Sequence, residues 1–356
     1  MSGSQNHGVR ATRLIVLLRD RLIRGIDHWD GFWFTPRHAD TLAFLRIAAG
    51  AMLLYSHVTL AMDLPAFVGN EALIDNATSK SLQDGTYGSP TAAFSTLWFI
   101  DSPGMIALHH GITILVTMLM TVGLLTRVTV PIAVLLQWML LHRLLGSLFG
   151  LDQIVTYCAM YLAITPCGSV FSVDAWLRDR FLNRKERAPA KHSLWLRWLF
   201  PTNEATVAAN VATRLLQLHL CAIYLFGGLA KARGQMWWDG TALWYAISNY
   251  EYQSIDVTFL SVYPKLFTAL THVAMFWEIF YIALVWPKAT RGIVLALAVA
   301  VHGGIAAFLG MITFGLMMIA ANMIFIDPAT IRLFLRRDGC AVGSMAIERQ
   351  NSTTGA

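Results

Sequence analysis

The chain has 356 residues, of which 56% are hydrophobic and only 13% are charged, and its mean hydropathy is +0.53. A soluble domain carries roughly 25% charged residues, so this composition excludes an ordinary water-soluble domain and favours an integral membrane protein. The net charge of +6 does not indicate a nucleic-acid partner, because no nucleic-acid-reading motif accompanies it.

The N-terminal segment is basic and amphipathic. Residues 12–27 read TRLIVLLRDRLIRGID, a pattern typical of a helix that lies on the anionic cytoplasmic face of a bilayer. Residues 1–30 are therefore predicted to be a cytoplasmic basic amphipathic segment. The first long apolar run starts near residue 41, too late for an ordinary cleavable signal peptide.

Apolar runs of spanning length follow along the chain. They lie near residues 41–62, 105–125, 129–149, 151–168, 207–230, 266–286, 292–309 and 310–326. Within a bilayer, a helix satisfies its own backbone polar groups. The predicted fold class is an all-α polytopic bundle of about eight transmembrane helices, and the last two runs are close enough to form a tight hairpin.

The distribution of charge predicts which loops face the cytoplasm. Threading eight spans in order places these basic residues on one side: Arg10, Arg13, Arg19, Arg21, Arg24, Arg127, Arg178, Arg180, Arg184, Lys185, Arg187, Lys191, Arg197, Lys288, Arg291, Arg332, Arg336 and Arg337. The opposite loops, near residues 63–104 and 231–264, are poor in Lys and Arg. The positive-inside rule then places both termini in the cytoplasm.

The predicted domain organisation follows from these spans. Residues 31–330 form the transmembrane domain, with a cytoplasmic linker at about 175–204, and residues 331–356 form a cytoplasmic tail that is expected to be disordered. The four cysteines, Cys158, Cys167, Cys221 and Cys340, lack paired spacing, so neither a disulfide framework nor a metal site is predicted.

The end of the fifth span carries the densest group of polar residues. Gln217, Cys221, Tyr224, Gly228 and Lys231 are spaced 4, 3, 4 and 3 residues apart, so they share one helix face, which we expect to turn toward other helices. A lysine in a dry site can become a base near neutral pH. The alternative is an interfacial lysine that extends to water beside a belt of tryptophans.

Other ionisable residues within the spans are also candidates, because such groups are costly in a membrane and usually functional. Asp152 either pairs with Arg143 across a turn or orients a substrate. His302 is either a helix–helix contact or a functional group. Glu278 needs a cationic partner, for which Lys231 and His272 are both available.

Several motifs resemble the bacterial HTTM family, which is related to the membrane part of vitamin K-dependent gamma-carboxylase. They are the run from Phe94 to Pro103, the GLLTR sequence that ends at Arg127, the run from Pro166 to Asp174, the block around Lys231 and the span of His302. Their order and spacing cover roughly residues 30–330.

The resemblance implies roles for individual residues. Lys231 is similar in position to the lysine that is thought to deprotonate vitamin K hydroquinone in the carboxylase, and Asp152 takes the place of an assisting histidine. The candidate catalytic residues are thus Lys231, Asp152 and His302, and the candidate substrate-binding residues are Gln217, Tyr224, Trp238 and Glu278. The carboxylase's large extramembrane domain has no counterpart here, so full glutamate carboxylation is not expected.

Two classes of function remain open at this stage. The first is an enzyme of the bacterial inner membrane that acts on a lipophilic quinol-type or peptide substrate, with a quinone or hydroquinone as its cofactor and Lys231 as its base. The second is a non-catalytic accessory or transport-like membrane protein. In both classes, the lipid bilayer is a partner of the protein. A lipophilic small molecule or a secreted peptide is a further candidate partner. No nucleic-acid partner is expected.

Overall fold

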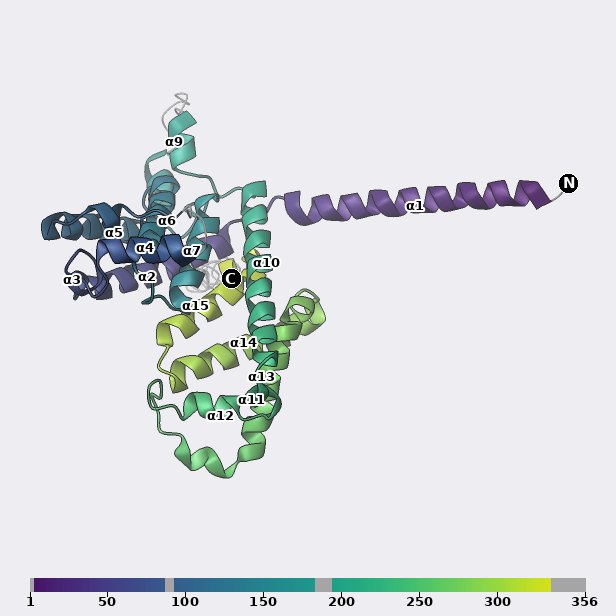
Figure 1. The fold of residues 1–356 in the computed structure, drawn as a ribbon. Coiled ribbons are helices and arrows are strands. Elements are labelled where there is room, and N and C mark those ends of the chain that lie inside the picture. Colours follow the sequence, from purple (N-terminus) through teal and green to yellow (C-terminus); the bar gives the residue numbers. More distant parts are fainter. Residues whose placement is uncertain (1–2, 87–92, 183–193, 334–356) are drawn as a thin grey trace, which may run out of the picture.

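The computed structural model describes residues 3–86, 93–182 and 194–333, and these are helical apart from loops and an isolated antiparallel bridge between Arg37 and Thr206 (Figure 1). The α-helices are α1 (Gly3–Phe34), α2 (Asp40–Ala61), α3 (Leu64–Phe67), α4 (Asn76–Thr86), α5 (Pro103–Val122), α6 (Thr126–Arg143), α7 (Gly150–Ala163), α8 (Val173–Leu177), α9 (Leu194–Leu199), α10 (Val207–Ala232), α11 (Gln235–Trp238), α12 (Ala242–Ile247), α13 (Pro264–Leu284), α14 (Lys288–Phe308) and α15 (Ile312–Asn322). Shorter turns are η1 (Thr96–Phe99), η2 (Arg178–Leu182), η3 (Thr258–Val262) and η4 (Met323–Phe325).

Each of the eight predicted spans is a helix, and five of these helices are long and apolar enough to cross a membrane. The five are α2, α5, α10, α13 and α14. Of the others, α7 has 14 residues, about 21 Å at 1.5 Å per residue, which is shorter than a hydrocarbon core of about 30 Å. The structure thus supports a multi-pass membrane protein.

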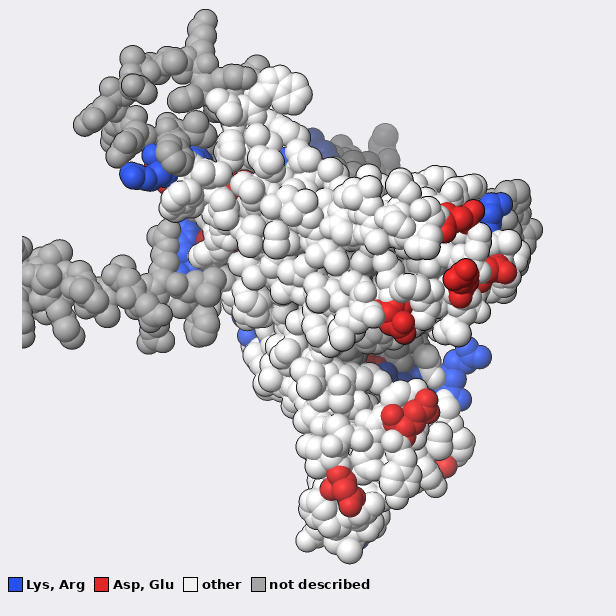
Figure 2. Space-filling view, turned by 90° about the vertical axis from the view of Figure 1, so that its left-hand side faces the viewer, with Lys and Arg blue, Asp and Glu red and all other residues white. Residues whose placement is uncertain are grey.

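The exposed side chains of the spanning helix α5 are apolar. On α5, Leu108, Ile112, Leu115, Met118 and Val122 are all exposed and recur every three or four residues, so they form one continuous face of the helix. Figure 2 shows a broad side of the molecule with few charged side chains over its centre. Such a surface suits lipid rather than water.

The first helix is longer than the sequence predicts. It runs from Gly3 to Phe34 instead of residues 12–27, and it extends away from the other helices (Figure 1). Leu22, Ile26 and Trp29 are exposed on it, as an amphipathic segment requires if it is to contact a membrane surface.

The helices of the eight predicted spans share one core, and two smaller apolar clusters lie outside it. Helix α2 packs against α5, α7 and α15, while α10 packs against α13, and α14 against α15. The predicted hairpin at Leu309 is confirmed, because the chain turns through Gly310, whose φ of 68° suits glycine. A Cβ atom at Gly315 would lie 2.5 Å from the carbonyl oxygen of His302, so only glycine allows α14 and α15 to approach this closely.

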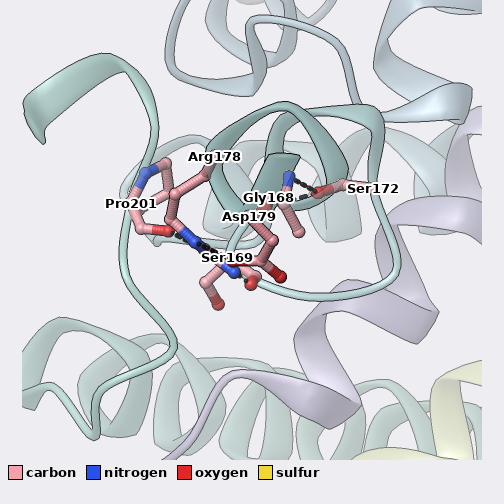
Figure 3. A network of polar contacts seen from close by, with 7 residues as sticks. Gly168, Ser169, Ser172, Arg178, Asp179 and Pro201 are labelled. Carbon is pink, nitrogen blue, oxygen red and sulfur yellow. Dashed lines mark hydrogen bonds and ion pairs between the residues drawn. The ribbon is translucent and has the colours of Figure 1, made fainter. Parts of the chain in front are cut away.

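Residues 175–182 and 194–204 of the predicted linker between the two halves lie within the described residues. Arg178 donates hydrogen bonds to the carbonyl oxygens of Ser169 and Pro201 and pairs with Asp179 (Figure 3). Ser172 caps α8 by accepting from Ala175. These bonds tie the segment after α7 to the segment before α10. The basic residues 184–191 and residues 334–356 of the predicted tail lie outside the described residues. At residues 331–333 the prediction of disorder is wrong, because they are helical and Arg332 donates to Asp40.

Candidate functional site

The predicted polar face of α10 is buried, as expected. Gln217, Cys221, Tyr224 and Gly228 are all buried, and Lys231 is half-buried at the end of the face. A Cβ atom at Gly228 would lie 2.8 Å from the backbone of Ile279. This glycine therefore lets α10 and α13 pack closely, which brings Lys231 next to α13.

Lys231 pairs with Glu278 on α13. Its Nζ atom lies 2.6 Å from Oε2 of Glu278, and the two side chains are 29% and 11% exposed. The ammonium group also lies 5.4 Å from the centre of the Trp237 ring. Of the two cations considered for Glu278, the structure selects Lys231, because His272 contacts the carbonyl oxygen of Trp238 instead.

A chain of buried hydrogen bonds lies further along the same face. Tyr281 donates to Oδ1 of Asn322 over 2.6 Å, and Nδ2 of Asn322 donates to the hydroxyl of Tyr224 over 2.7 Å. The Tyr224 hydroxyl lies 2.8 Å from Nε2 of His302. Because this hydroxyl already accepts from Asn322, its own proton is free to be donated to His302.

The direction of these hydrogen bonds determines which ring nitrogen of His302 carries the proton. If Nε2 accepts from Tyr224, the neutral ring carries its proton on Nδ1. The Nδ1 atom is buried and has no partner among the described residues. A buried donor without an acceptor is costly, so this N–H is available to a bound ligand.

Trp277 connects the ion pair with the histidine. It directly precedes Glu278, and its ring lies 4.9 Å from that of Tyr224 and 6.2 Å from that of His302. Its Nε1 atom donates to the carbonyl oxygen of Val294 on α14. Lys231, Glu278, Tyr224 and His302 therefore belong to one region in which α10, α13, α14 and α15 meet.

The other candidates are placed differently. Gln217 donates to the carbonyl oxygen of Ile324 and accepts from Arg214, so it lies near the beginning of α10 and not beside Lys231. Trp238 is 52% exposed and donates to the carbonyl oxygen of Ala232.

Asp152 takes a capping role in the structure. Its carboxylate accepts from the backbone N–H of Phe149 over 3.1 Å, in the first turn of α7. It is linked to the His302 region only indirectly, through Gly150 and the Phe314 ring.

The predicted pair between Asp152 and Arg143 is wrong, because Arg143 donates to Asn76, Gly69 and Ile74. A buried arginine with five donors is better satisfied by several acceptors of a folded loop than by one carboxylate.

Sequence reasoning missed Asn322 and Tyr281. Asn322 is a strongly polar residue in an otherwise apolar helix, and polar residues in membrane helices usually bond across a helix interface, so the signal was present. Within the described chain, no group of three or more His, Cys, Asp and Glu side chains is arranged to hold a metal ion. A ligand of this site would meet an amine, a carboxyl group, aromatic rings and an imidazole N–H.

Comparison of the chain with protein-family models, with curated proteins and with solved structures gave no match. The function is therefore argued from the residues of the chain.

Proposed function

We propose that this chain is a multi-pass enzyme of the bacterial inner membrane, of the HTTM or gamma-carboxylase-like type, that acts on a lipophilic quinol with Lys231 as its base. The observation that carries the proposal is the combination of a paired Lys231 and Glu278 with an unpartnered Nδ1 of His302 in one helix-lined region. An amine that accepts a proton and an N–H that binds an oxyanion are the two groups that deprotonation of a hydroxyl needs.

Proton transfer from Lys231 to Glu278 produces a neutral amine without changing the total charge of the pair. Because the side chains of Lys231 and Glu278 are only 29% and 11% exposed, moving one proton from Lys231 to Glu278 converts two partly buried charges into two neutral groups and so lowers the desolvation cost of both. The neutral amine then accepts the proton of the quinol O–H group, and the electron pair of that bond stays on oxygen. His302 donates its Nδ1–H to the resulting anion, while Tyr224 and Asn322 hold the imidazole in place.

The alternative is a non-catalytic accessory or transport-like protein. In that case, the same ion pair joins α10 to α13, and the tyrosine–asparagine–histidine chain fixes the crossing of the helices. This alternative predicts that Lys231→Arg is tolerated, because guanidinium retains both the charge and the hydrogen bond.

The experiment measures the rate at which a reduced short-chain menaquinol consumes oxygen. The rate with full-length wild-type protein in lipid nanodiscs is compared with the rates of its variants. A quinol anion reacts with oxygen faster than the neutral quinol, so the wild type is expected to accelerate uptake. Lys231→Arg cannot accept a proton and should lower the rate by about a hundredfold or more, the usual contribution of a general base. Lys265→Arg, at an exposed lysine, is the matched control. Equal rates of oxygen uptake for the wild type and Lys231→Arg would show that Lys231 is not the base.

The eight-span topology with both termini in the cytoplasm is part of this proposal. It is supported by the basic residues on one set of loops and the acidic residues on the other. In a variant without native cysteines, single cysteines near residues 80 and 250 should react with an impermeant thiol reagent in intact cells, and one near residue 185 should not. Reaction at residue 185 would overturn the threading.

A further inference from the structure

A second region of unusual chemistry lies near the beginning of α10, at the other end of that helix from Lys231. A cavity of about 540 Å³ is lined there by Arg37, His38, Asn210, Arg214, Asp327 and Arg332. An adjoining cavity of about 150 Å³ shares Arg37, Arg214 and Asp327 and adds Arg291. Segments far apart in the sequence thus bring their arginines to one place.

The charges around these cavities do not balance. Arg332 is already neutralised by Asp40, to which it donates two hydrogen bonds of 2.9 and 2.6 Å. Three guanidinium groups, those of Arg37, Arg214 and Arg291, then face the single carboxylate of Asp327. None of the three forms an ion pair with any residue in the described part of the chain. The excess of two positive charges is unusual for a partly buried site.

Arg37 has the most unused hydrogen-bonding capacity. Its only side-chain hydrogen bond within the described ranges is a long one, 3.4 Å to the carbonyl oxygen of Ile326, although the group carries five N–H donors. Burial, Arg214 and Arg291 lower the pKa of Arg37, and Asp327 opposes them. An anion in the cavity would remove this repulsion.

Arg214 and Arg291 are better anchored than Arg37. Arg214 donates to the carbonyl oxygen of Phe32 and to Gln217, and its guanidinium lies 4.3 Å from the centre of the Phe32 ring. Arg291 donates to the carbonyl oxygens of Val285 and Trp286. These bonds fix the positions of two guanidinium groups in advance, so little entropy is lost when an anion binds.

We propose that this cavity binds a phosphate group, either that of an anionic phospholipid or free phosphate. Arginines match the oxygens of phosphate in a bidentate manner, and basic pockets between membrane helices bind anionic lipid headgroups. Gly31 and Thr35 line the cavity, and Trp29 and Phe34, which flank Gly31 in the last turns of α1, are exposed apolar side chains. That position favours a lipid as the source of the phosphate. The site is independent of Lys231 and of the proposed quinol chemistry.

The test measures binding to the purified full-length protein by native mass spectrometry and by the shift in unfolding temperature. The probes are phosphatidylglycerol, the zwitterionic phosphatidylcholine, phosphate-free diacylglycerol and inorganic phosphate. The wild type should bind phosphatidylglycerol in preference to phosphatidylcholine and diacylglycerol, neither of which has a net charge. Arg37→Gln should weaken this binding about tenfold, since it removes one charge-assisted contact. Lys265→Gln removes an equal charge from an exposed position outside the cavity and should have no effect.

Asp327→Asn provides a variant that gains rather than loses affinity. It removes the single carboxylate that faces the cavity but keeps an oxygen that can accept from the N–H of Ala329, so it should bind phosphatidylglycerol several-fold more tightly. If inorganic phosphate alone stabilises the protein, and Arg37→Gln abolishes the effect, the site is confirmed with free phosphate as its ligand. Unchanged binding in both Arg37→Gln and Asp327→Asn would overturn the proposal, and if Arg37→Gln does not fold, Asp327→Asn decides alone.

Discussion

The two halves of the molecule satisfy their buried polar side chains in different ways. In the first half, these side chains bond mainly to backbone carbonyls: Arg143 donates to Gly69 and Ile74, Ser79 donates to Arg143, and His110 donates to His57. In the second half, some buried side chains such as Gln217 and Trp277 also donate to backbone carbonyls, but four pairs around His302 and Lys231 join one side chain to another. They are Lys231 with Glu278, Tyr224 with His302 and with Asn322, and Asn322 with Tyr281.

The difference matters for the proposed function. A side chain that bonds to backbone carbonyls holds a loop or helix end in position, and no proton moves along such a bond. Side chains that bond to each other can exchange protons and can rearrange around a ligand. Under the proposed function, the first half is the scaffold and the second half holds the candidate site. Four predictions follow from this comparison, from the largest expected effect to the smallest.

The largest effect is expected from Arg143→Met, which removes a buried scaffold residue. It leaves the carbonyl oxygens of Gly69 and Ile74 and the amide oxygen of Asn76 without their donor. A buried acceptor left unpaired costs roughly 1–3 kcal/mol, so the free energy of unfolding should fall by about 3 kcal/mol or more. Thermal unfolding in detergent measures the loss. The control is Lys265→Met, which should change little.

Tyr224→Phe should have a smaller effect on stability and a larger one on the proposed activity. It removes the hydroxyl that bonds to both Asn322 and His302, at a cost of about 2 kcal/mol. Tyr245→Phe, at an exposed tyrosine, is the control. If oxygen uptake with menaquinol does not change in Tyr224→Phe, the second half is scaffold as well.

The Lys231–Glu278 ion pair is expected to contribute less to the free energy of unfolding than Arg143 or the Tyr224 hydroxyl. A double-mutant cycle with Lys231→Met and Glu278→Gln should give a coupling energy of about 1 kcal/mol, because the lysine is partly exposed and solvent screens the pair. Both single variants should lose menaquinol-dependent oxygen uptake. A coupling energy well above this value, with uptake retained, would show that the pair is structural.

The smallest effect is expected from Asp75→Ala, at the start of α4. Hydrogen bonds from the backbone and side chain of Thr78 lower the pKa of Asp75 from its ordinary value of 3.8. The ionised cap therefore stabilises α4 above that value, and its contribution is lost as the pH falls through the lower pKa of the folded state. Hydrogen exchange in α4 should be faster in Asp75→Ala at neutral pH, with a difference that shrinks in acid. A difference that grows in acid would contradict the cap.

Local sequence patterns were sufficient to predict the helical class, a helix within each of the eight apolar runs, the buried face of α10 and the hairpin at Gly310. These features are local: they depend on runs of apolar residues, on spacings of three and four, and on a glycine that takes a positive φ. The end of α1 was predicted less well, because its last residues are fixed by contacts of Asn210 and Arg214 with the carbonyl oxygens of Phe32 and Trp33.

Only the tertiary structure decided which polar groups meet. Tyr224 bonds to Asn322, 98 residues away, while Arg143 and Asp152 are neighbours in sequence and do not pair. Arg37, Arg214 and Arg291 meet at cavities that no local pattern marks. The physical reason is that the rotation and crossing of packed helices select the partners. That packing depends on close contacts such as Gly228 against Ile279 and Gly315 against His302.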